Sequence, residues 1–274
     1  MSSAVGASGG GGTTHGGATL AKTLVDICDS GCLTTLSTEG DEGIPFGTLC
    51  SYAKLDGTLV FGLPRDGIHA VNAEKQSNCS LLLQHPHFFG ESQAQATLVG
   101  HLRRFEGNDV EVSAAFTALD AAQPGLPRDA LSLYILEIDR CYLVEPFRNG
   151  GSWIDLADYN AALPDPLRSI NVGLVERWNS ERENIEDIRM IAQCRGVSLD
   201  EGVSVSMANV DAEGFDLCVL RGEGRTEFVR VPHAHGHTCT TERDAIASLC
   251  QHAQLAWEDS AHAKAGASDA WHPR

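Results

Sequence analysis

The stretch Leu63-Pro-Arg-Asp-Gly-Ile-His-Ala-Val-Asn-Ala-Glu-Lys-Gln-Ser-Asn-Cys-Ser-Leu-Leu-Leu83 places a short helical segment between two apolar runs that are typical of β-strands. We expect Asp66 to cap this helix, because its carboxylate can accept hydrogen bonds from the first free N–H groups. The helix carries His69. A neutral imidazole held between two strands can ligate a metal or a heme iron. A helix histidine without a function is the alternative.

Further short strands are predicted on both sides of this segment. Asp56-Gly57 predicts a tight hairpin. Apolar periodicity predicts helices over 19–30, ended by Gly31, and over 108–122. The predicted strands cover residues 32–37, 47–55, 58–63, 79–84, 94–105, 131–138 and 141–147. Many short strands with two or three helices packed on them indicate a closed or partly closed antiparallel β-barrel.

Pro164-Asp-Pro166 marks the start of a second pattern. A helical stretch over 167–195 precedes three strands, and a last helix begins near Thr241 with Asp244 as its capping partner. The three strands cover residues 203–210, 216–220 and 226–231. The sequence therefore predicts an α+β protein in which a small α/β domain follows the barrel.

The predicted domain limits are a barrel over 18–160 and a small α/β domain over 165–258. Residues 1–17 are rich in Gly, Ser and Thr and are expected to form a disordered lead. Residues 259–274 are expected to form a loose tail, since they are polar and rich in alanine.

Composition restricts the partners of the chain. Its formal net charge of −17 over 274 residues argues against a nucleic-acid backbone or an anionic membrane as the main partner. No apolar run approaches the ~20 residues that span a bilayer. The nine cysteines are an odd number without CxxC spacing, which favours a reducing compartment and no disulfide framework.

Several motifs resemble a known family. Gly43-Ile-Pro-Phe-Gly-Thr-Leu-Cys50 and Ile68-His-Ala-Val-Asn72 are similar to the FMN-binding split-barrel superfamily, and within it to the heme-binding branch related to HugZ-type heme oxygenases. Ser132-Leu-Tyr134 and Asn184-Ile-Glu-Asp-Ile188 resemble the plastid glutamyl-tRNA reductase-binding proteins of plants and algae. The resemblance implies an FMN-binding-type split antiparallel β-barrel with a small appended domain.

The same resemblance implies a function. It predicts a homodimer in the chloroplast stroma that binds b-type heme. This protein would regulate tetrapyrrole biosynthesis by binding glutamyl-tRNA reductase in a heme-sensitive way. The transit peptide is expected to be absent from this chain.

Three residues are candidates for the heme site. His69 is the first choice as ligand of the heme iron. Arg148, in the turn Pro146-Phe-Arg-Asn-Gly-Gly151, is a second candidate, because relatives place an arginine in such a turn near heme. A solvated turn arginine is the alternative. His101 shares one strand face with Arg103, where both would line an interface pocket or face water, and we favour water.

Enzymatic alternatives remain open at this point. Heme-degrading relatives carry a His-Met-Asn-x-Asp-His motif, whereas this chain has Arg177-Trp-Asn-Ser-Glu-Arg182. The loss of both histidines weakens the case for an oxygen-dependent heme oxygenase. An FMN-dependent oxidoreductase is weaker still, since only Arg65, Lys75 and Ser80 are available to hold a phosphate.

The most conspicuous histidine cluster is His233-Ala-His-Gly-His237. Alternate histidines on an extended segment can bind zinc, nickel or copper, or supply a heme ligand. A loop insertion with adventitious metal affinity is the favoured interpretation of this cluster.

Overall fold

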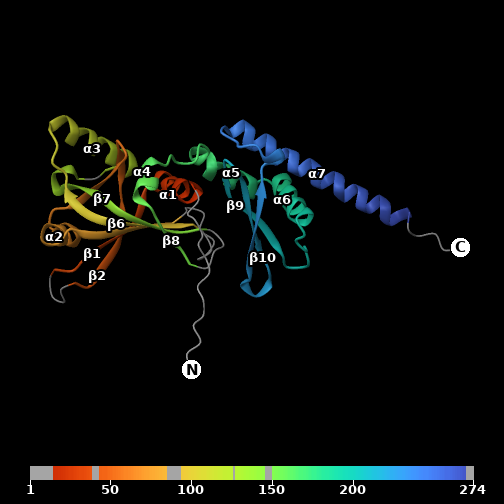
Figure 1. Ribbon diagram of the computed structural model, residues 1–274, viewed down its shortest axis with the longest axis horizontal. Helices are drawn as coiled ribbons and strands as arrows, with labels where there is room; N and C mark the ends of the chain where they lie inside the picture. Colours follow the sequence, from red (N-terminus) through yellow and green to blue (C-terminus); the bar gives the residue numbers. More distant parts are fainter. Residues whose placement is uncertain (1–14, 39–42, 85–93, 126, 146–149, 270–274) are drawn as a thin grey trace, which may run out of the picture. The chain divides into compact units, whose positions relative to one another are not determined.

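The computed structural model describes residues 15–38, 43–84, 94–125, 127–145 and 150–269, and these form two compact units (Figure 1). The first contains the described residues up to 163, and the second those from 164 onward. None of the described helices is both long and apolar enough to cross a membrane.

The first unit is a curled antiparallel sheet (Figure 1). Its strand order is β2-β1-β5-β6-β7-β4-β3, and β8 pairs with β7. The strands are β1 (Ser30–Leu36), β2 (Pro45–Ser51), β3 (Ala53–Leu55), β4 (Thr58–Pro64), β5 (Asn78–Gln84), β6 (Gln95–Arg104), β7 (Leu131–Val144) and β8 (Ser152–Ile154). The predicted α+β fold with a split antiparallel barrel is therefore confirmed.

Two local predictions in this sheet have different outcomes. The Asp56-Gly57 hairpin is confirmed, because both residues have positive φ (48° and 81°), as a type I′ turn requires. The two strands predicted over 131–138 and 141–147 are instead the single strand β7, whose register shifts opposite Val99 and Gly100. At Gly100 an added Cβ would lie 1.8 Å from the Glu137 carbonyl oxygen, so only glycine fits this bulge.

Helices cover both faces of the sheet. The helices α1 (His15–Ile27), α2 (Ile68–Lys75) and α4 (Leu156–Ala161) pack into the main core of this unit, on the inner face of the barrel. The helix α3 (Asp109–Ala122) covers the outer side of β3, β4 and β7. Leu33, Leu81 and Leu98 are fully buried in the main core, where each such side chain contributes roughly 1.5–3 kcal/mol.

Three predictions about helix ends are wrong. The helix α1 begins at His15, inside the segment expected to be a disordered lead, and it ends at Ile27. Gly31 does not end the helix but lies in β1, where glycine permits the close approach of β5: a Cβ at this position would lie 2.7 Å from the Leu82 carbonyl oxygen. The N-cap of α2 is Gly67, which makes no side-chain cap hydrogen bond, so Asp66 does not cap this helix.

The second unit is a three-stranded antiparallel sheet with helices. Its elements are α5 (Arg168–Ser180), α6 (Arg182–Cys194), β9 (Ser204–Asp211), β10 (Gly214–Leu220), β11 (Thr226–Pro232) and α7 (Glu242–Asp269). The strand order is β11-β10-β9. The helix predicted over 167–195 is two helices, since the chain turns extended at Glu181.

The start of α7 is as predicted, but its end is not. Thr241 Oγ1 accepts a hydrogen bond from the Asp244 N–H (3.2 Å) and donates one to the Asp244 carboxylate (2.7 Å). The helix then continues to Asp269, through most of the segment expected to be a loose tail. Four of the eleven residues over 259–269 are alanine, the strongest helix former.

Candidate functional site

The helix α2 presents His69 on the inner face of the barrel. Ala70 and Ala73 bury one side of the helix in the main core. At its other end, Glu74 accepts a 2.8 Å hydrogen bond from the Tyr134 hydroxyl and lies 3.6 Å from the Arg104 guanidinium. These contacts tie α2 to β7 and β6, so the position of His69 is set by the fold.

Both ring nitrogens of His69 have partners. Nδ1 lies 2.9 Å from Thr35 Oγ1 on β1, and Nε2 lies 2.7 Å from Thr48 Oγ1 on β2. The residue is only 6% exposed, and the Phe46 ring lies 5.7 Å from the imidazole. His69 therefore bridges the helix to two neighbouring strands.

Asn72 determines the direction of these hydrogen bonds. Its Nδ2 donates to Thr35 Oγ1 (2.9 Å), while its Oδ1 accepts from the N–H and the hydroxyl of Thr38 (both 3.1 Å). Since Thr35 Oγ1 accepts from Asn72, its own proton is donated to His69 Nδ1, which is the one acceptor that the described residues offer to this hydroxyl. The proton of the neutral ring accordingly sits on Nε2 and is donated to Thr48.

The chemistry of His69 fits a heme iron in one respect and conflicts in another. Burial lowers the pKa of His69, so the ring is neutral at neutral pH, which is the state that ligates iron. However, ligation through Nε2 requires the ring proton to move to Nδ1 and the Thr48 hydroxyl to leave. Thr48 lies on the exposed part of β2, where such a movement meets little packing.

His101 lies on the other face of the sheet. Thr35, Cys79 and Gly100 are partners across β1, β5 and β6, so they share the inner face with His69. The next residue on β6, His101, points outward. Its Nδ1 lies 3.1 Å from Ser77 Oγ, and its Nε2 lies 3.1 Å from the Asp139 carboxylate.

The structure thus does not bring His69 and His101 together. His69 and His101 face opposite sides of one sheet, and Arg148 lies outside the described residues. The side chain of His101 is 33% exposed, so its burial does not decide whether it lines an interface pocket or faces water.

The residues considered for FMN are likewise separated. Ser80 points outward, since its neighbours Cys79 and Leu81 are buried on the inner face. Lys75 ends α2, on the inner side. Arg65 donates to the Leu131 carbonyl oxygen (3.3 Å) at the end of β4. These three residues form no common phosphate cradle.

The outer face carries a group that sequence reasoning did not single out. The Arg140 guanidinium lies 3.7 Å above the centroid of the Trp153 ring, and Tyr142 meets that ring edge-on at 5.1 Å. Alternation places Arg140 and Tyr142 on one face of β7, which was a usable signal. Their meeting with Trp153 depends on the pairing of β7 with β8, which the sequence does not reveal.

The histidine cluster of the second unit has structural partners. His233 is 2% exposed, with Nδ1 3.0 Å from Ser248 Oγ and Nε2 2.8 Å from the Asp211 carbonyl oxygen. His235 bonds Gln251, and its ring lies 6.2 Å from that of His237. Among the described residues, no three His, Cys, Asp or Glu side chains are arranged to hold a metal ion.

Asn179 has a structural partner as well. Its side chain donates to the Met207 carbonyl oxygen (2.8 Å) and accepts from the Met207 N–H (2.7 Å), so it pairs with β9 as a strand would. Arg177, which replaces a histidine of the heme-degrading motif, pairs with Glu242 at 3.7 Å. The remaining part of that motif therefore holds the second unit together.

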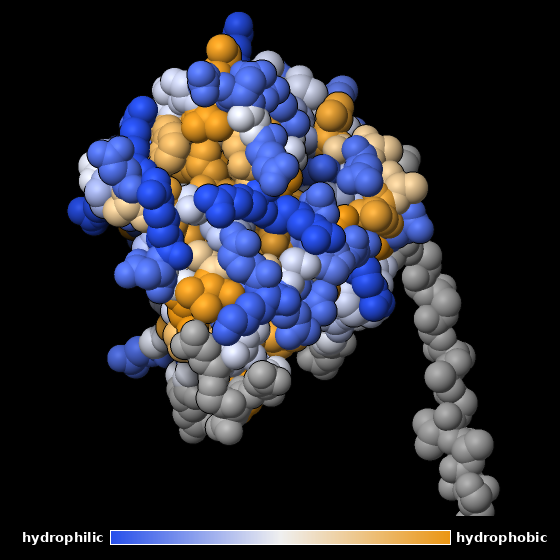
Figure 2. All heavy atoms as spheres, turned by 90° about the vertical axis from the view of Figure 1, so that its left-hand side faces the viewer, coloured by the Kyte–Doolittle hydropathy of each residue, from blue (hydrophilic) through white to orange (hydrophobic). Residues whose placement is uncertain are grey.

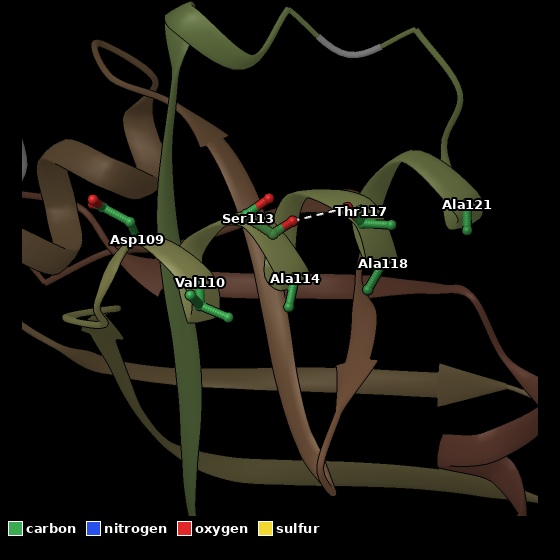
Figure 3. Close-up of a pocket in the computed structure, with 7 residues that line it drawn as sticks. All are labelled: Asp109, Val110, Ser113, Ala114, Thr117, Ala118 and Ala121. Atoms are coloured by element: carbon green, nitrogen blue, oxygen red, sulfur yellow. Dashed lines mark hydrogen bonds between the residues drawn. The ribbon is translucent and has the colours of Figure 1, made fainter.

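A shallow depression on α3 offers no chemistry. It is lined by Asp109, Val110, Ser113, Ala114, Thr117, Ala118 and Ala121 (Figure 3). The Thr117 hydroxyl is committed to the Ser113 carbonyl oxygen at 2.9 Å. Asp109 is the one titratable residue of this lining, so we assign it no function.

Comparison with known proteins places the chain in a family. Residues 13–161 match the family described as CREG, beta-barrel, and the chain belongs to this family. The chain is also 31% identical over 243 residues to the chloroplastic glutamyl-tRNA reductase-binding protein of Arabidopsis thaliana, covering 88% of this chain and 71% of that protein. The predicted family resemblance is confirmed.

A solved structure shares the fold. The heme-binding protein from Mycobacterium smegmatis superposes with a TM-score of 0.57 at 24% identity. The match covers 88% of this chain and 98% of that one, so both units take part in it.

Proposed function

We propose that this protein is a heme-binding regulator of tetrapyrrole biosynthesis that binds glutamyl-tRNA reductase in a heme-sensitive way. The observation that carries the proposal is the 31% identity, extending over 243 residues, to a protein named for binding that reductase. The fold shared with a bacterial heme-binding protein supports heme as the ligand. Because the plant relative is chloroplastic, we place the protein in the chloroplast stroma.

His69 is the proposed ligand of a b-type heme, through Nε2 after release from Thr48. A bound heme would supply a redox-active iron and a porphyrin ring with a strong Soret band, and the protein would supply the imidazole and the surrounding side chains. Arg148 is proposed as the nearby cation. His101 belongs to the opposite face and is assigned to the outer surface.

A regulator is favoured over a heme oxygenase. Arginines stand at both histidine positions of the heme-degrading motif, and the remaining Asn179 is fully engaged with Met207. Hemin supplied with a reductant and oxygen tests this choice. A persistent Soret band supports the regulator, whereas its conversion to a biliverdin-like product supports the oxygenase. A yellow protein with flavin absorbance would overturn both in favour of FMN.

We also propose a homodimer that forms through β2. This edge strand exposes Phe46 (42%) and Leu49 (77%), and Ile44 (51%) lies just before it; such a concentration of exposed apolar side chains is typical of an interface. Apolar patches among charged side chains are visible in Figure 2. Leu49→Asp should shift the protein to monomer in sedimentation, whereas Val110→Asp on α3 should not. Sedimentation of the wild-type protein as a monomer would overturn this proposal.

The regulatory function is tested by a pull-down with purified glutamyl-tRNA reductase. The reductase should be retained without hemin and released as hemin is added. Zinc protoporphyrin, which offers a different metal, serves as the control for non-specific porphyrin effects. Absence of binding in both conditions would refute the reductase-binding function.

A further inference from the structure

One row of side chains crosses the outer face of the barrel. Register places Leu82, Thr97, Tyr142 and Trp153 in line across β5, β6, β7 and β8. The helices α1, α2 and α4 pack on the inner side, and α3 packs against the cluster near β3 and β4. Among the described residues, no helix is seen to cover this row.

Arg140 lies over Trp153, the last residue of this row. It has no ion pair or hydrogen bond with the described residues. Asp139 is engaged with His101 at 3.1 Å. Asp155 accepts hydrogen bonds from the Ala157 and Asp158 N–H groups (2.8 and 3.2 Å) at the start of α4. Among the described residues, the guanidinium is therefore held by the Trp153 ring alone, which leaves its N–H donors available to an anion.

The Trp153 ring is itself held in place while remaining 46% exposed. The edge of Tyr142 lies against it, and the Tyr142 hydroxyl accepts a 3.1 Å hydrogen bond from the Gly151 N–H. A Cβ at Gly151 would lie 2.8 Å from the Tyr142 ring, so glycine permits this close approach. Asp139, Ile154, Asp155 and Leu156 complete a shallow depression beside the ring.

The chemistry of this surface selects a flat aromatic ligand with carboxylates. Guanidinium groups bind carboxylates through two parallel hydrogen bonds, and indole rings contact flat aromatic groups. From Leu82 to Trp153 the row spans three strand spacings, about 14 Å, which is comparable to the width of a tetrapyrrole with its side chains. Leu82 and Thr97 are half-buried and uncharged, so they extend the surface without adding charge.

We propose that Arg140 and Trp153 form a tetrapyrrole-binding site on the outer face, in which Arg140 binds a propionate and no iron ligand is needed. The proposal rests on the proposed heme-binding function and adds to it a contact on the face opposite His69. It concerns the porphyrin ring and its carboxylates, so a porphyrin without metal is bound as well.

Titration of the full chain with metal-free protoporphyrin IX tests this site. Binding is followed by porphyrin absorbance and by quenching of tryptophan fluorescence. Arg140→Ala and Trp153→Ala should each weaken binding about tenfold or more, as expected for loss of a charge-assisted or aromatic contact. Arg140→Lys should be weakened less than Arg140→Ala. His69→Ala should bind metal-free protoporphyrin like the wild type.

Two controls separate the site from other causes. Protoporphyrin dimethyl ester lacks free carboxylates, so it should bind wild type and Arg140→Ala equally. Both mutated side chains are surface groups, and unchanged thermal unfolding verifies that the variants fold. If Trp153→Ala does not fold, Trp153→Phe replaces it as a variant that keeps an aromatic ring.

The outcomes are distinguishable. Wild-type affinity of Arg140→Ala and Trp153→Ala for protoporphyrin would overturn the outer-face site while leaving hemin binding through His69 intact. A wild-type protein that binds neither hemin nor protoporphyrin would overturn the proposed heme-binding function together with this site.

Discussion

The two faces of the barrel sheet differ in how their polar groups are used. On the inner face, His69 and Asn72 are buried, and their polar atoms are hydrogen-bonded to threonines. On the outer face, Arg140 is exposed and stacked on a ring without an ionic partner in the described residues. Buried groups with complete hydrogen bonding stabilise the fold, whereas exposed groups with free donors are available for a ligand.

The largest expected effect on stability is at Asn72. Its side chain is fully buried and makes three hydrogen bonds that connect α2 with β1 and Thr38. Asn72→Ala removes the acceptor of the Thr38 N–H and hydroxyl and the amide that donates to Thr35, and it leaves a cavity at a fully buried position, so we expect a loss of about 2–4 kcal/mol in unfolding free energy. Urea denaturation measures it, with the exposed Asn78→Ala as control. An unchanged midpoint would refute the structural role of the inner-face network.

A second comparison concerns His69 as a ligand. Thr48→Val removes the competitor for Nε2, so hemin affinity should rise a few-fold, while His69→Ala should lower it about tenfold, equivalent to about 1.4 kcal/mol. Soret titration measures both variants, and Thr117→Val on α3 is the matched control. If His69→Ala leaves the Soret spectrum unchanged, His69 is a structural residue only.

The third effect is the pH dependence of stability. Burial lowers the pKa of His69 in the folded protein, so between that pKa and the ordinary value near 6.5 the unfolded chain binds more protons. Stability should therefore fall as the pH drops below about 6.5, with at most about 1.4 kcal/mol per pH unit from this residue. His69→Gln should show a shallower fall between pH 7 and 5. Parallel curves for both proteins would contradict this assignment.

The smallest effect is expected on the outer face. Arg103 pairs with Glu137 at 3.1 Å, and both side chains are more than half exposed. Exposed ion pairs contribute little, so Arg103→Ala should change the unfolding free energy by less than about 0.5 kcal/mol. A loss comparable to that of Asn72→Ala would show that the two faces do not differ as described.

Local signals predicted the elements of the fold well. The Asp56-Gly57 turn and the Thr241 cap involve residues close in sequence, and both occur as expected. Gly31 was misjudged, because its role is a close approach to Leu82, which is distant in sequence. The break at Glu181 and the continuous β7 depend in the same way on packing and strand pairing that periodicity does not report.

The candidate site was predictable only in part. The sequence placed His69 on a short helix between strands, and the structure agrees. Its partners Thr35 and Thr48 lie 34 and 21 residues away, so only strand register identifies them. The opposite orientation of His101 follows from alternation only once the pairing of β1, β5 and β6 is known.

The sequence by itself determined the family, the strand and helix composition, and the presence of His69 on α2, because these depend on motifs and on local periodicity. Only the tertiary structure decided that His69 is hydrogen-bonded at both nitrogens and that Arg140 meets Trp153 on the opposite face. The physical reason is that register and sheet curvature bring together residues from distant strands, and these contacts set which polar groups remain available.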